Sequence, residues 1–403
     1  MARHGDATPS PHRLTARLLA VLAVVAATTA LSTDMYLSSF TAIATDLYAS
    51  GAAVQLTLTA FFVGVGVGQL LLGPFSDRWG RRPVLLAALI VFTAASVAMV
   101  FAPTIEVLIA LRLVQGVASA AGAVVSRAIA ADLSTGQTAV RALSLIALGG
   151  AFGPLVAPPL GALVAGWWGW RGVLAVLAAT GILMVAMATI AVPESLPPER
   201  RHGGGVVAAF ARFGPLLRMP RFTGLILAYA LGFATFIGYI AGSPFVGQLV
   251  LGMTPLGYAL AYSLSGTALI TANLVNARVA PRVGPRLMLR LGLVVMVGAS
   301  TVLLLLAATG ALAVWSFIAC AFCVVGSNGL VLANGSALAL AETDTGSRGA
   351  GSALLGAAQF ALAGFASPLV GIAGEHTAVP MAVAMTAASG LACLLGMLAT
   401  RRA

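Results

Sequence analysis

The chain has 403 residues, of which 60% are hydrophobic and only 8% are charged, and its formal net charge is +11. An ordinary soluble domain carries roughly 25% charged residues, so a soluble fold of this composition would expose large apolar patches. The basic residues are all arginines, and they stand at short intervals between apolar runs instead of forming an aromatic-rich basic stripe. Composition therefore argues against a soluble domain and against a nucleic-acid-binding protein, and it indicates a chain embedded in a lipid bilayer.

Apolar runs of roughly 20 residues, the length that crosses a bilayer as a helix, recur along the whole chain. Arg13 and Arg17 precede the first run, as in a signal peptide, but the run is long enough to span and is expected to stay uncleaved. We expect twelve transmembrane spans, near residues 18–39, 53–73, 83–102, 106–127, 142–166, 172–192, 222–244, 256–276, 287–308, 312–334, 349–370 and 379–399.

The arginines predict an orientation for these spans. If the N-terminus lies inside, all of the 22 basic residues fall in inner segments except Arg171, in an outer loop, and Arg112, within a span. This distribution follows the positive-inside rule, and a wrong number of spans would destroy it. We therefore expect a multi-pass protein of the bacterial inner membrane with both termini in the cytoplasm.

The longest inner segment divides the chain into two similar halves. It contains prolines and glycines typical of a linker. The segment Arg78–Arg82 after the second span is echoed by Arg282–Arg286 after the eighth, 204 positions later, as two related six-helix units would require. The expected divisions are a cytoplasmic tail 1–17, a first bundle 18–192, a cytoplasmic linker 193–221, a second bundle 222–399 and a tail 400–403.

The inner loop after the second span carries the most specific motif. Its glycines permit a tight turn, Asp77 is placed to meet a helix N-terminus or an arginine, and the arginines hold the loop at an anionic surface. The eleven residues Gly73–Pro83 closely resemble the loop signature of the major facilitator superfamily. The resemblance implies an all-α membrane fold with two six-helix bundles.

Two further spans carry patterns of the same family. The fourth, from Arg112 to Asp132, resembles the motif of proton-coupled members, and the fifth, with Gly149, Gly153 and Pro154, resembles the antiporter motif of drug exporters. The fifth departs from that motif at Pro158, and close helix packing by glycines is the alternative interpretation. The resemblance implies that conformational gating involves Gly73, Asp77, Arg78, Gly80, Arg81, Arg127, Asp132, Gly153 and Pro154.

The segments Ser32–Leu37 and Tyr239–Val246 resemble the bicyclomycin/chloramphenicol-resistance branch of the drug:proton antiporters. This resemblance implies a proton-coupled efflux antiporter that exports amphiphilic drugs or antibiotics by alternating access. The expected energy source is the proton gradient, with no cofactor and no metal. Expected partners are a small-molecule drug or metabolite, protons and the lipid bilayer, with no nucleic acid, and the protein is expected to be a monomer.

Two alternatives stay open. A proton-coupled uptake symporter would have the same fold, although the glycine and proline pattern of the fifth span argues against it. An intramembrane enzyme would need clustered ligands or a nucleophile with its base, and the spans contain neither, so no enzymatic activity is expected. Cys320 and Cys323 have metal-ligand spacing but no partner ligands in their apolar stretch, so they are expected to pack helices.

Asp34 and Arg112 are the charged residues expected well inside spans. A rise of 1.5 Å per residue places them at similar heights, about 24 Å and about 22 Å above the inner edge, so they could meet within one bundle. Intramembrane charges usually mark function. We therefore expect Asp34 to be the proton site and a substrate contact, with Arg112 tuning its protonation; a static salt bridge is the alternative.

The cargo cavity is expected to combine apolar, aromatic and amide side chains, which suit varied lipophilic molecules. Ordinary helix packing explains each of these side chains equally well. The candidates for substrate binding are Asp34, Met35, Tyr36, Gln115, Phe236, Tyr239, Asn273 and Asn328.

Overall fold

The computed structural model describes residues 14–151, 153–201, 213–344, 347–371 and 376–401, and this part of the chain contains helices and no strands. Apolar side chains without interruption by charge favour helices here, because a helix satisfies its own backbone groups where no water is present. The elements are α1 (Ala16–Ala26), α2 (Thr28–Leu37), α3 (Phe40–Asp46), α4 (Gly51–Trp79), α5 (Arg81–Val100), α6 (Ile105–Leu133), α7 (Gly136–Ala151), α8 (Gly153–Ala191), η1 (Pro198–Arg200), α10 (Phe213–Leu217), α11 (Pro220–Phe245), η2 (Val246–Val250), α12 (Pro255–Val283), α13 (Pro285–Ala308), α14 (Val314–Ala341), α15 (Arg348–Gly371) and α16 (Val379–Ala399).

The long helices account for all twelve expected spans. Nine of the described helices are each long and apolar enough to cross a membrane, and α1 with α2, bent by 43° between them, makes a tenth. α8 consists of two helices joined at Gly169, whose φ of 65° breaks the helical path. Its first arm and α7 together cover the expected fifth span, and its second arm covers the sixth. α15 supplies the eleventh expected span.

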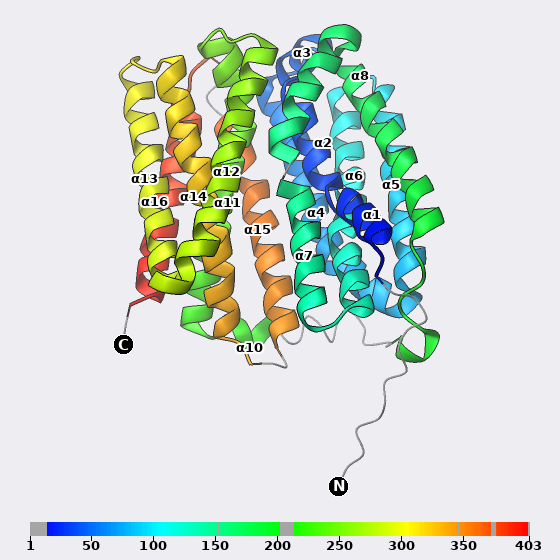
Figure 1. Ribbon diagram of the computed structural model, residues 1–403. Coiled ribbons are helices and arrows are strands. Elements are labelled where there is room, and N and C mark those ends of the chain that lie inside the picture. The colour runs from blue at the N-terminus through cyan, green and yellow to red at the C-terminus, as the bar shows by residue number, and fades with distance from the viewer. Residues whose placement is uncertain (1–13, 152, 202–212, 345–346, 372–375, 402–403) are drawn as a thin grey trace.

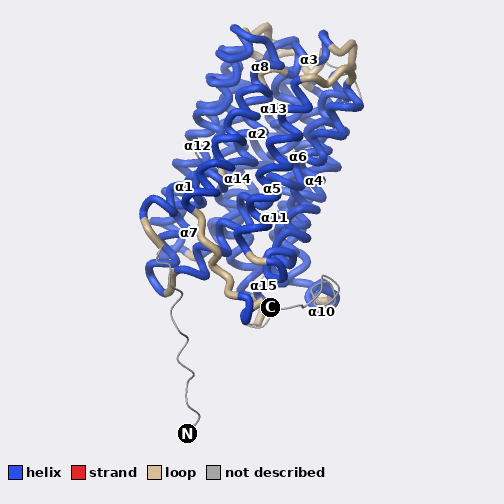
Figure 2. The backbone as a smooth tube through the Cα atoms, turned by 90° about the vertical axis from the view of Figure 1, so that its right-hand side faces the viewer, coloured by secondary structure: helices blue, strands red, loops and turns tan. Residues whose placement is uncertain are grey.

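The crossings form two bundles that lie side by side (Figure 1). α1 to α8 make the first bundle and α11 to α16 the second, which confirms the expected fold class. Figure 2, a view turned by 90°, shows the long helices following a common direction, with the short α10 off one end. The expected linker 193–221 joins the bundles, but its residues 202–212, like residues 1–13 and 402–403 of the expected tails, lie outside the described residues.

Several helices continue beyond the apolar runs that predicted them. α4 ends at Trp79 instead of residue 73, α6 at Leu133 instead of 127, and α12 at Val283 instead of 276. The length of an apolar run reflects the thickness of the hydrocarbon layer, whereas a helix continues beyond it for as long as its backbone hydrogen bonds are formed. The extra turns of α4 and α6 carry Asp77, Arg78 and Asp132, which were predicted to gate.

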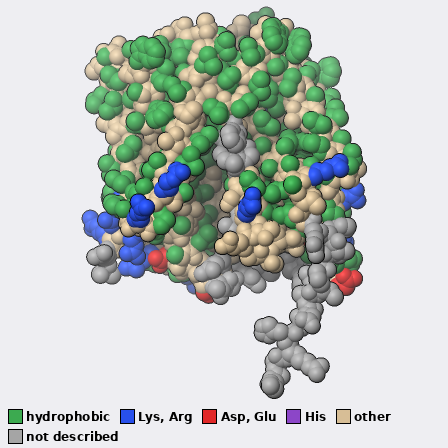
Figure 3. Space-filling view, in the orientation of Figure 1, with side chains coloured by type: hydrophobic (Ala, Val, Ile, Leu, Met, Phe, Trp, Pro, Cys, Tyr) green, Lys and Arg blue, Asp and Glu red, His purple; other side chains and the backbone are tan. Residues whose placement is uncertain are grey.

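The basic side chains gather at one end of both bundles, here named the arginine-rich end, which includes the α4–α5 and α12–α13 turns and the end of α16. In Figure 3 the arginines of the visible face lie in its lower half. Exposed tryptophans mark both ends: Trp79 at the arginine-rich end, and Trp167 and Trp315 at the opposite end. Tryptophans at two levels are typical of the two interfaces of a membrane.

The internal repeat is visible in the backbone. α4 and α12 both have 29 residues, and each ends in a glycine with almost the same positive φ, 101° at Gly80 and 88° at Gly284. The corresponding ψ values are 153° and 148°, a conformation that is essentially restricted to glycine. The 204-residue repeat predicted from the arginine-rich loops is therefore also a repeat of the turn itself.

These two glycines make a matched pair for mutation. A Cβ added at Gly80 would lie 2.4 Å from Glu194 Oε2, whereas one added at Gly284 meets no atom within 4 Å. Gly284→Ala should therefore lose only the backbone term of about 1–3 kcal/mol, and Gly80→Ala should lose more. Thermal unfolding of the two variants in detergent checks this difference; equal losses would show that the contact with Glu194 contributes nothing.

Candidate functional site

Arg112 is completely buried in the first bundle, and only its Nη1 has hydrogen-bond partners there; its Nε and Nη2 have none among the described atoms. Its Nη1 donates to the main-chain oxygen of Ser32 at 3.1 Å and to Gln115 Oε1 at 2.7 Å. The guanidinium carbon lies 4.4 Å from the centre of the Tyr36 ring and 4.5 Å from that of Phe61. Cation–π contacts of this kind are strongest where water is excluded, about 2 kcal/mol or more. Arg112 thus joins α6 to α2 and α4.

Asp34 is also buried, but it faces the boundary between the bundles. Its Oδ1 accepts a hydrogen bond from the Tyr262 hydroxyl at 3.3 Å, and Tyr262 belongs to α12 of the second bundle. A Cβ placed on Gly153 would lie 3.3 Å from Asp34 Oδ2 and 2.5 Å from Ala30. The carboxylate therefore sits where α2, α8 and α12 meet.

The expected meeting of Asp34 with Arg112 is wrong as an ion pair. Among the described residues no nitrogen of Arg112 lies within 4.0 Å of an Asp34 oxygen. The two residues do share a height, because Arg112 binds Ser32 and Tyr36 on either side of Asp34. Ser32 and Tyr36 are four residues apart and share one face of α2, whereas Asp34, two residues from each, points away from that face.

Glycines bring the helices around Asp34 into close contact. A Cβ on Gly161 of α8 would lie 2.1 Å from the main-chain oxygen of Met35, so only glycine fits there. Across the bundle boundary, Gly266 of α12 lies against Pro154 of α8. Gly153 and Pro154 of the predicted antiporter motif therefore contact both Asp34 and the second bundle. Their assignment to gating stays a prediction.

Hydrogen bonds join the two bundles at the end of the molecule opposite to the arginine-rich end. Thr41 donates to Gln248 Oε1 at 2.8 Å, and Gln248 Nε2 donates to the main-chain oxygen of Ser38 at 3.4 Å. Gln55 Nε2 donates to the main-chain oxygen of Ala241 at 3.2 Å. Each bond joins the first bundle to α11 or η2, so this end is closed between the bundles.

A cavity of about 760 Å³ lies between the bundles at the arginine-rich end. Figure 3 shows a furrow between the two halves that widens toward this end. In its wall the Tyr229 hydroxyl donates to Gln359 Oε1 at 2.6 Å, and Arg127 Nε donates to the main-chain oxygen of Ala123. The polar and charged residues of the lining are Gln69, Asp77, Arg127, Tyr229, Ser336, Ser352 and Gln359. The structure is thus open between the bundles at one end and closed at the other.

The predicted aromatic and apolar cargo contacts do not line this cavity. Met35, Tyr36, Phe236 and Tyr239 are buried and packed against other rings or helices; Tyr239 is stacked on Tyr262 with ring centres 5.8 Å apart. These side chains are packed together because the bundles are closed at the end opposite to the arginine-rich end. Their contact with cargo stays a prediction for a conformation in which that end opens.

The amide candidates also have structural neighbours. Gln115 uses its Oε1 for Arg112 and its Nε2 for Ser96 Oγ at 2.8 Å, so it positions Arg112 in this conformation. The Asn273 amide lies beside Gly329, and Asn328 is buried with an Oδ1 that has no hydrogen-bond partner among the described atoms. The Asn328 side chain thus has a buried amide oxygen that could accept a hydrogen bond from another group.

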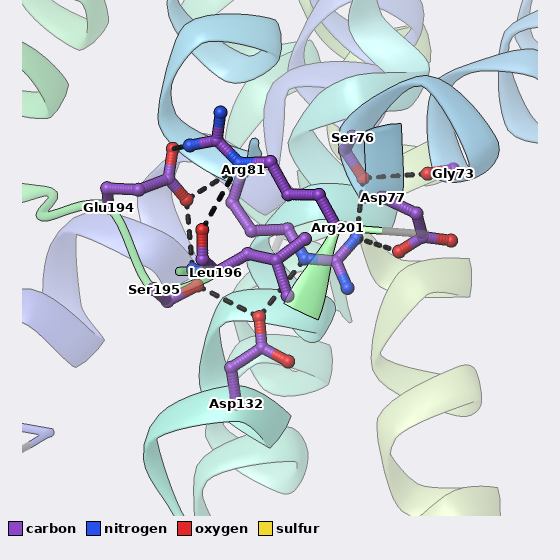
Figure 4. A network of polar contacts seen from close by, with 9 residues as sticks. All are labelled: Gly73, Ser76, Asp77, Arg81, Asp132, Glu194, Ser195, Leu196 and Arg201. Carbon is purple, nitrogen blue, oxygen red and sulfur yellow. Dashed lines mark hydrogen bonds and ion pairs between the residues drawn. The ribbon is translucent and has the colours of Figure 1, made fainter. Parts of the chain in front are cut away.

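The loop Gly73–Pro83, which was predicted to take part in gating, forms a compact ionic network (Figure 4). Arg81 is its centre: its guanidinium lies 2.5 Å from Asp77 Oδ1 and 3.1 Å from Asp132 Oδ2, and its Nη1 donates to Ser76 Oγ at 2.7 Å. The Arg81 side chain is 11% exposed, so this arginine is largely removed from water. It ties the α4–α5 turn to the end of α6.

Two residues after α8 complete the network and were not among the predicted site residues. Glu194 Oε1 accepts from the main-chain N–H of Arg81 at 3.0 Å, and its Oε2 lies 3.7 Å from Arg201 Nη2. Ser195 Oγ donates to Asp132 Oδ2 at 2.9 Å. The sequence offered one sign of this role: Glu194 is an acidic residue directly after the sixth span, on the side of the protein where most other charged residues are arginines.

The other predicted arginines behave differently. Arg78 is exposed and belongs to none of the ion pairs found in the described part of the chain. In this conformation the positive-inside rule is the explanation for an arginine at this position. Arg127 lines the cavity near Tyr229 and makes no ion pair with Asp132. Of the charges predicted to gate together, the structure joins Asp77, Arg81 and Asp132, and leaves Arg78 and Arg127 outside.

Comparison with known families decides the assignment. Residues 22–368 match the family model described as Major Facilitator Superfamily. The chain belongs to the major facilitator superfamily. It is therefore a multi-pass membrane transporter, as the loop Gly73–Pro83 predicted.

Relatives and solved structures of the superfamily agree. The chain is 35% identical to an uncharacterized MFS-type transporter, YdgK, of Bacillus subtilis, over 94% of both chains. It is 29% identical to a bicyclomycin resistance protein homolog of Haemophilus influenzae over 88% of both, and 30% identical to a chloramphenicol resistance protein of Pseudomonas aeruginosa over 65% of this chain and 62% of that one. These relatives confirm the branch predicted from Ser32–Leu37 and Tyr239–Val246.

Among solved structures, a bacterial homolog of the human lysosomal transporter Spinster superposes with a TM-score of 0.74 at 16% identity, covering 95% of this chain and 96% of that one. The xylose transporter XylE from E. coli gives 0.73 at 15% identity, with the same coverage. At this identity the likeness establishes the fold of the superfamily and nothing finer.

The network predicts unequal effects for two neighbouring arginines of the superfamily loop. Arg81→Gln removes the partner of two carboxylates and should destabilise the protein by about 1–3 kcal/mol. Arg78→Gln should stay within about 0.5 kcal/mol of wild type, because an exposed unpaired arginine contributes little. Thermal unfolding in detergent compares them, and a loss in Arg78→Gln as large as that in Arg81→Gln would contradict the network.

Proposed function

We propose that this transporter is a proton-coupled antiporter that exports amphiphilic drugs or antibiotics by alternating access. The observation that carries the proposal is the position of Asp34, a buried carboxylate at the contact of α2, α8 and α12, with a hydrogen bond across the bundle boundary. A carboxylate in that place gains or loses a proton only when the boundary is rearranged. Protonation and conformation are thereby coupled.

We propose that Asp34 releases its proton toward the arginine-rich end and reloads from the opposite end. The cavity at the arginine-rich end and the bonded opposite end correspond to one of the two states that alternating access needs. If the arginine-rich end faces the cytoplasm, as the positive-inside rule predicts, this state faces inward and accepts cargo from the cell. Both termini are then cytoplasmic, and the membrane is the bacterial inner membrane.

The cargo class is proposed from the branch and from the cavity. The relatives carry names of resistance to bicyclomycin, chloramphenicol and multiple drugs. The cavity of about 760 Å³ combines apolar walls with amide, hydroxyl and charged groups, a mixture that accommodates amphiphilic molecules. We propose that the proton gradient supplies the energy, without a cofactor and without covalent turnover of the cargo.

Replacing Asp34 by Asn tests the proton site. Asp34→Asn cannot exchange a proton, so gradient-driven uptake of labelled chloramphenicol into inside-out vesicles should fall to the level of empty vesicles. Asp46→Asn is the matched control, because Asp46 is exposed at the opposite end and binds Arg171 and Trp170. Full gradient-driven uptake by Asp34→Asn would overturn the proton site, and uptake that survives collapse of the gradient would overturn antiport.

Tyr262→Phe tests the bond between the bundles. It keeps the ring that stacks on Tyr239 and removes the hydroxyl that donates a hydrogen bond to Asp34. Losing this bond should weaken closure of the end opposite to the arginine-rich end by about 1 kcal/mol, which changes the ratio of closed to open molecules by a factor of about five. Tyr258→Phe is the control, because its hydroxyl bonds Ser243 within the second bundle.

The measurement is the distance between spin labels at Tyr48 and Leu256, both exposed near the opposite end, in a background in which the three native cysteines are replaced by serine. Tyr262→Phe should increase the long-distance population, and Tyr258→Phe should not. The same increase in both variants would mean that the bond to Asp34 has no special part in closure.

A further inference from the structure

A second charged pocket lies at the arginine-rich end of the second bundle, away from the cavity between the bundles. It has a volume of about 310 Å³ and is here named the basic pocket; its residues are Arg221, Leu225, Arg286, Leu338, Glu342, Ala399, Thr400 and Arg401. Four helices meet there: α11 and α13 begin at Pro220 and Pro285, and α14 and α16 end at Ala341 and Ala399. No step of the transport cycle described above uses these residues.

The charge of the basic pocket is unbalanced. Three arginines face one carboxylate, Glu342, and none of the four takes part in an ion pair among the described residues. The first bundle differs, since its Arg81 is paired with two carboxylates at the equivalent end. An unbalanced group of guanidinium ions in a pocket attracts an anion, and the planar fork of arginine suits phosphate oxygens.

The beginnings of α11 and α13 add to this attraction. Arg221 and Arg286 are the second residues of helices whose first turns leave backbone N–H groups without intrahelical partners, and the helix dipole is positive there. Arg290, one turn into α13, donates to Thr400 Oγ1 at 2.9 Å and to its main-chain oxygen at 2.7 Å. This contact fixes the end of α16 beside α13 and so keeps Arg286 and Arg401 in one pocket.

The surroundings favour a lipid as the source of the anion. Leu287 and Leu291 follow Arg286 within the apolar helix α13, and Leu398 precedes Arg401 within the last turn of α16; their exposures are 46%, 45% and 47%. Exposed leucines within membrane-spanning helices contact acyl chains. A phosphate bound by the arginines and a chain lying on these leucines fit one phospholipid molecule, and basic pockets between helices at this interface suit anionic headgroups.

We propose that the basic pocket is a specific binding site for the phosphodiester headgroup of an anionic phospholipid. The bound headgroup bridges the ends of α11, α13 and α16 and reduces the repulsion among their arginines. It thereby stabilises the second bundle at the end opposite to the Asp34 contacts. The site is separate from the cargo cavity, so the proposal does not depend on the transport function.

The test uses the full-length protein in detergent, titrated with phosphatidylglycerol and followed by native mass spectrometry and thermal unfolding. Arg286→Gln/Arg401→Gln should weaken phosphatidylglycerol binding about twenty-five-fold, since each arginine that contacts the anionic headgroup contributes about fivefold. The matched control is Arg278→Gln/Arg282→Gln, which removes two exposed arginines of α12 at the same end but outside the pocket and should stay within about twofold of wild type.

A second variant keeps the test informative if the double substitution impairs folding. Glu342→Gln removes the one carboxylate of the pocket and should tighten phosphatidylglycerol binding about fivefold. Equal weakening by the two double substitutions, or no effect of Glu342→Gln, would overturn the site, because both results mean general attraction to a basic surface. Inorganic phosphate is the competitor: displacement of the lipid at equal concentration would assign the pocket to a free phosphate and overturn the lipid assignment.

Discussion

The membrane offers no water to a charged group, and the structure depends on how the chain meets that constraint for Arg112 and Asp34. Arg112 contacts a main-chain oxygen, an amide and two aromatic rings within the first bundle, while its Nε and Nη2 have no partner among the described atoms. Asp34 is not one of its partners and faces the second bundle instead. A salt bridge between them would fix both charges in one bundle, whereas the observed arrangement places Asp34 at the boundary between the bundles.

The position of Asp34 depends in turn on small residues. Gly153 and Gly161 of α8 let that helix touch α2, and Gly266 lets α12 touch Pro154. This close approach places the Tyr262 hydroxyl within hydrogen-bonding distance of Asp34. The glycine and proline pattern of the fifth span thus has a packing role next to Asp34, and its part in antiport stays a prediction.

The two halves repeat their backbone and differ in their charges. Gly80 and Gly284 make equivalent turns, yet the first turn is enclosed by Glu194 and Arg201 and the second is open. At the first bundle's end carboxylates pair with Arg81, and at the second bundle's end arginines outnumber the carboxylate. The same turn geometry is therefore compatible with two different charge environments: paired carboxylates in the first bundle and an excess of arginine in the second.

The sequence by itself determined the spans, their alternation, the repeat and the family, because these follow from local properties: apolar length, the placement of arginine and the residues Gly73–Pro83. It also placed Asp34 and Arg112 at one height, since height along a helix needs only counting. It did not determine which way each side chain points or which distant helix it meets. Tertiary packing decided that Asp34 bonds Tyr262 and that Glu194 completes the Arg81 network, because these contacts join residues 228 and 113 positions apart that only the assembled structure brings together.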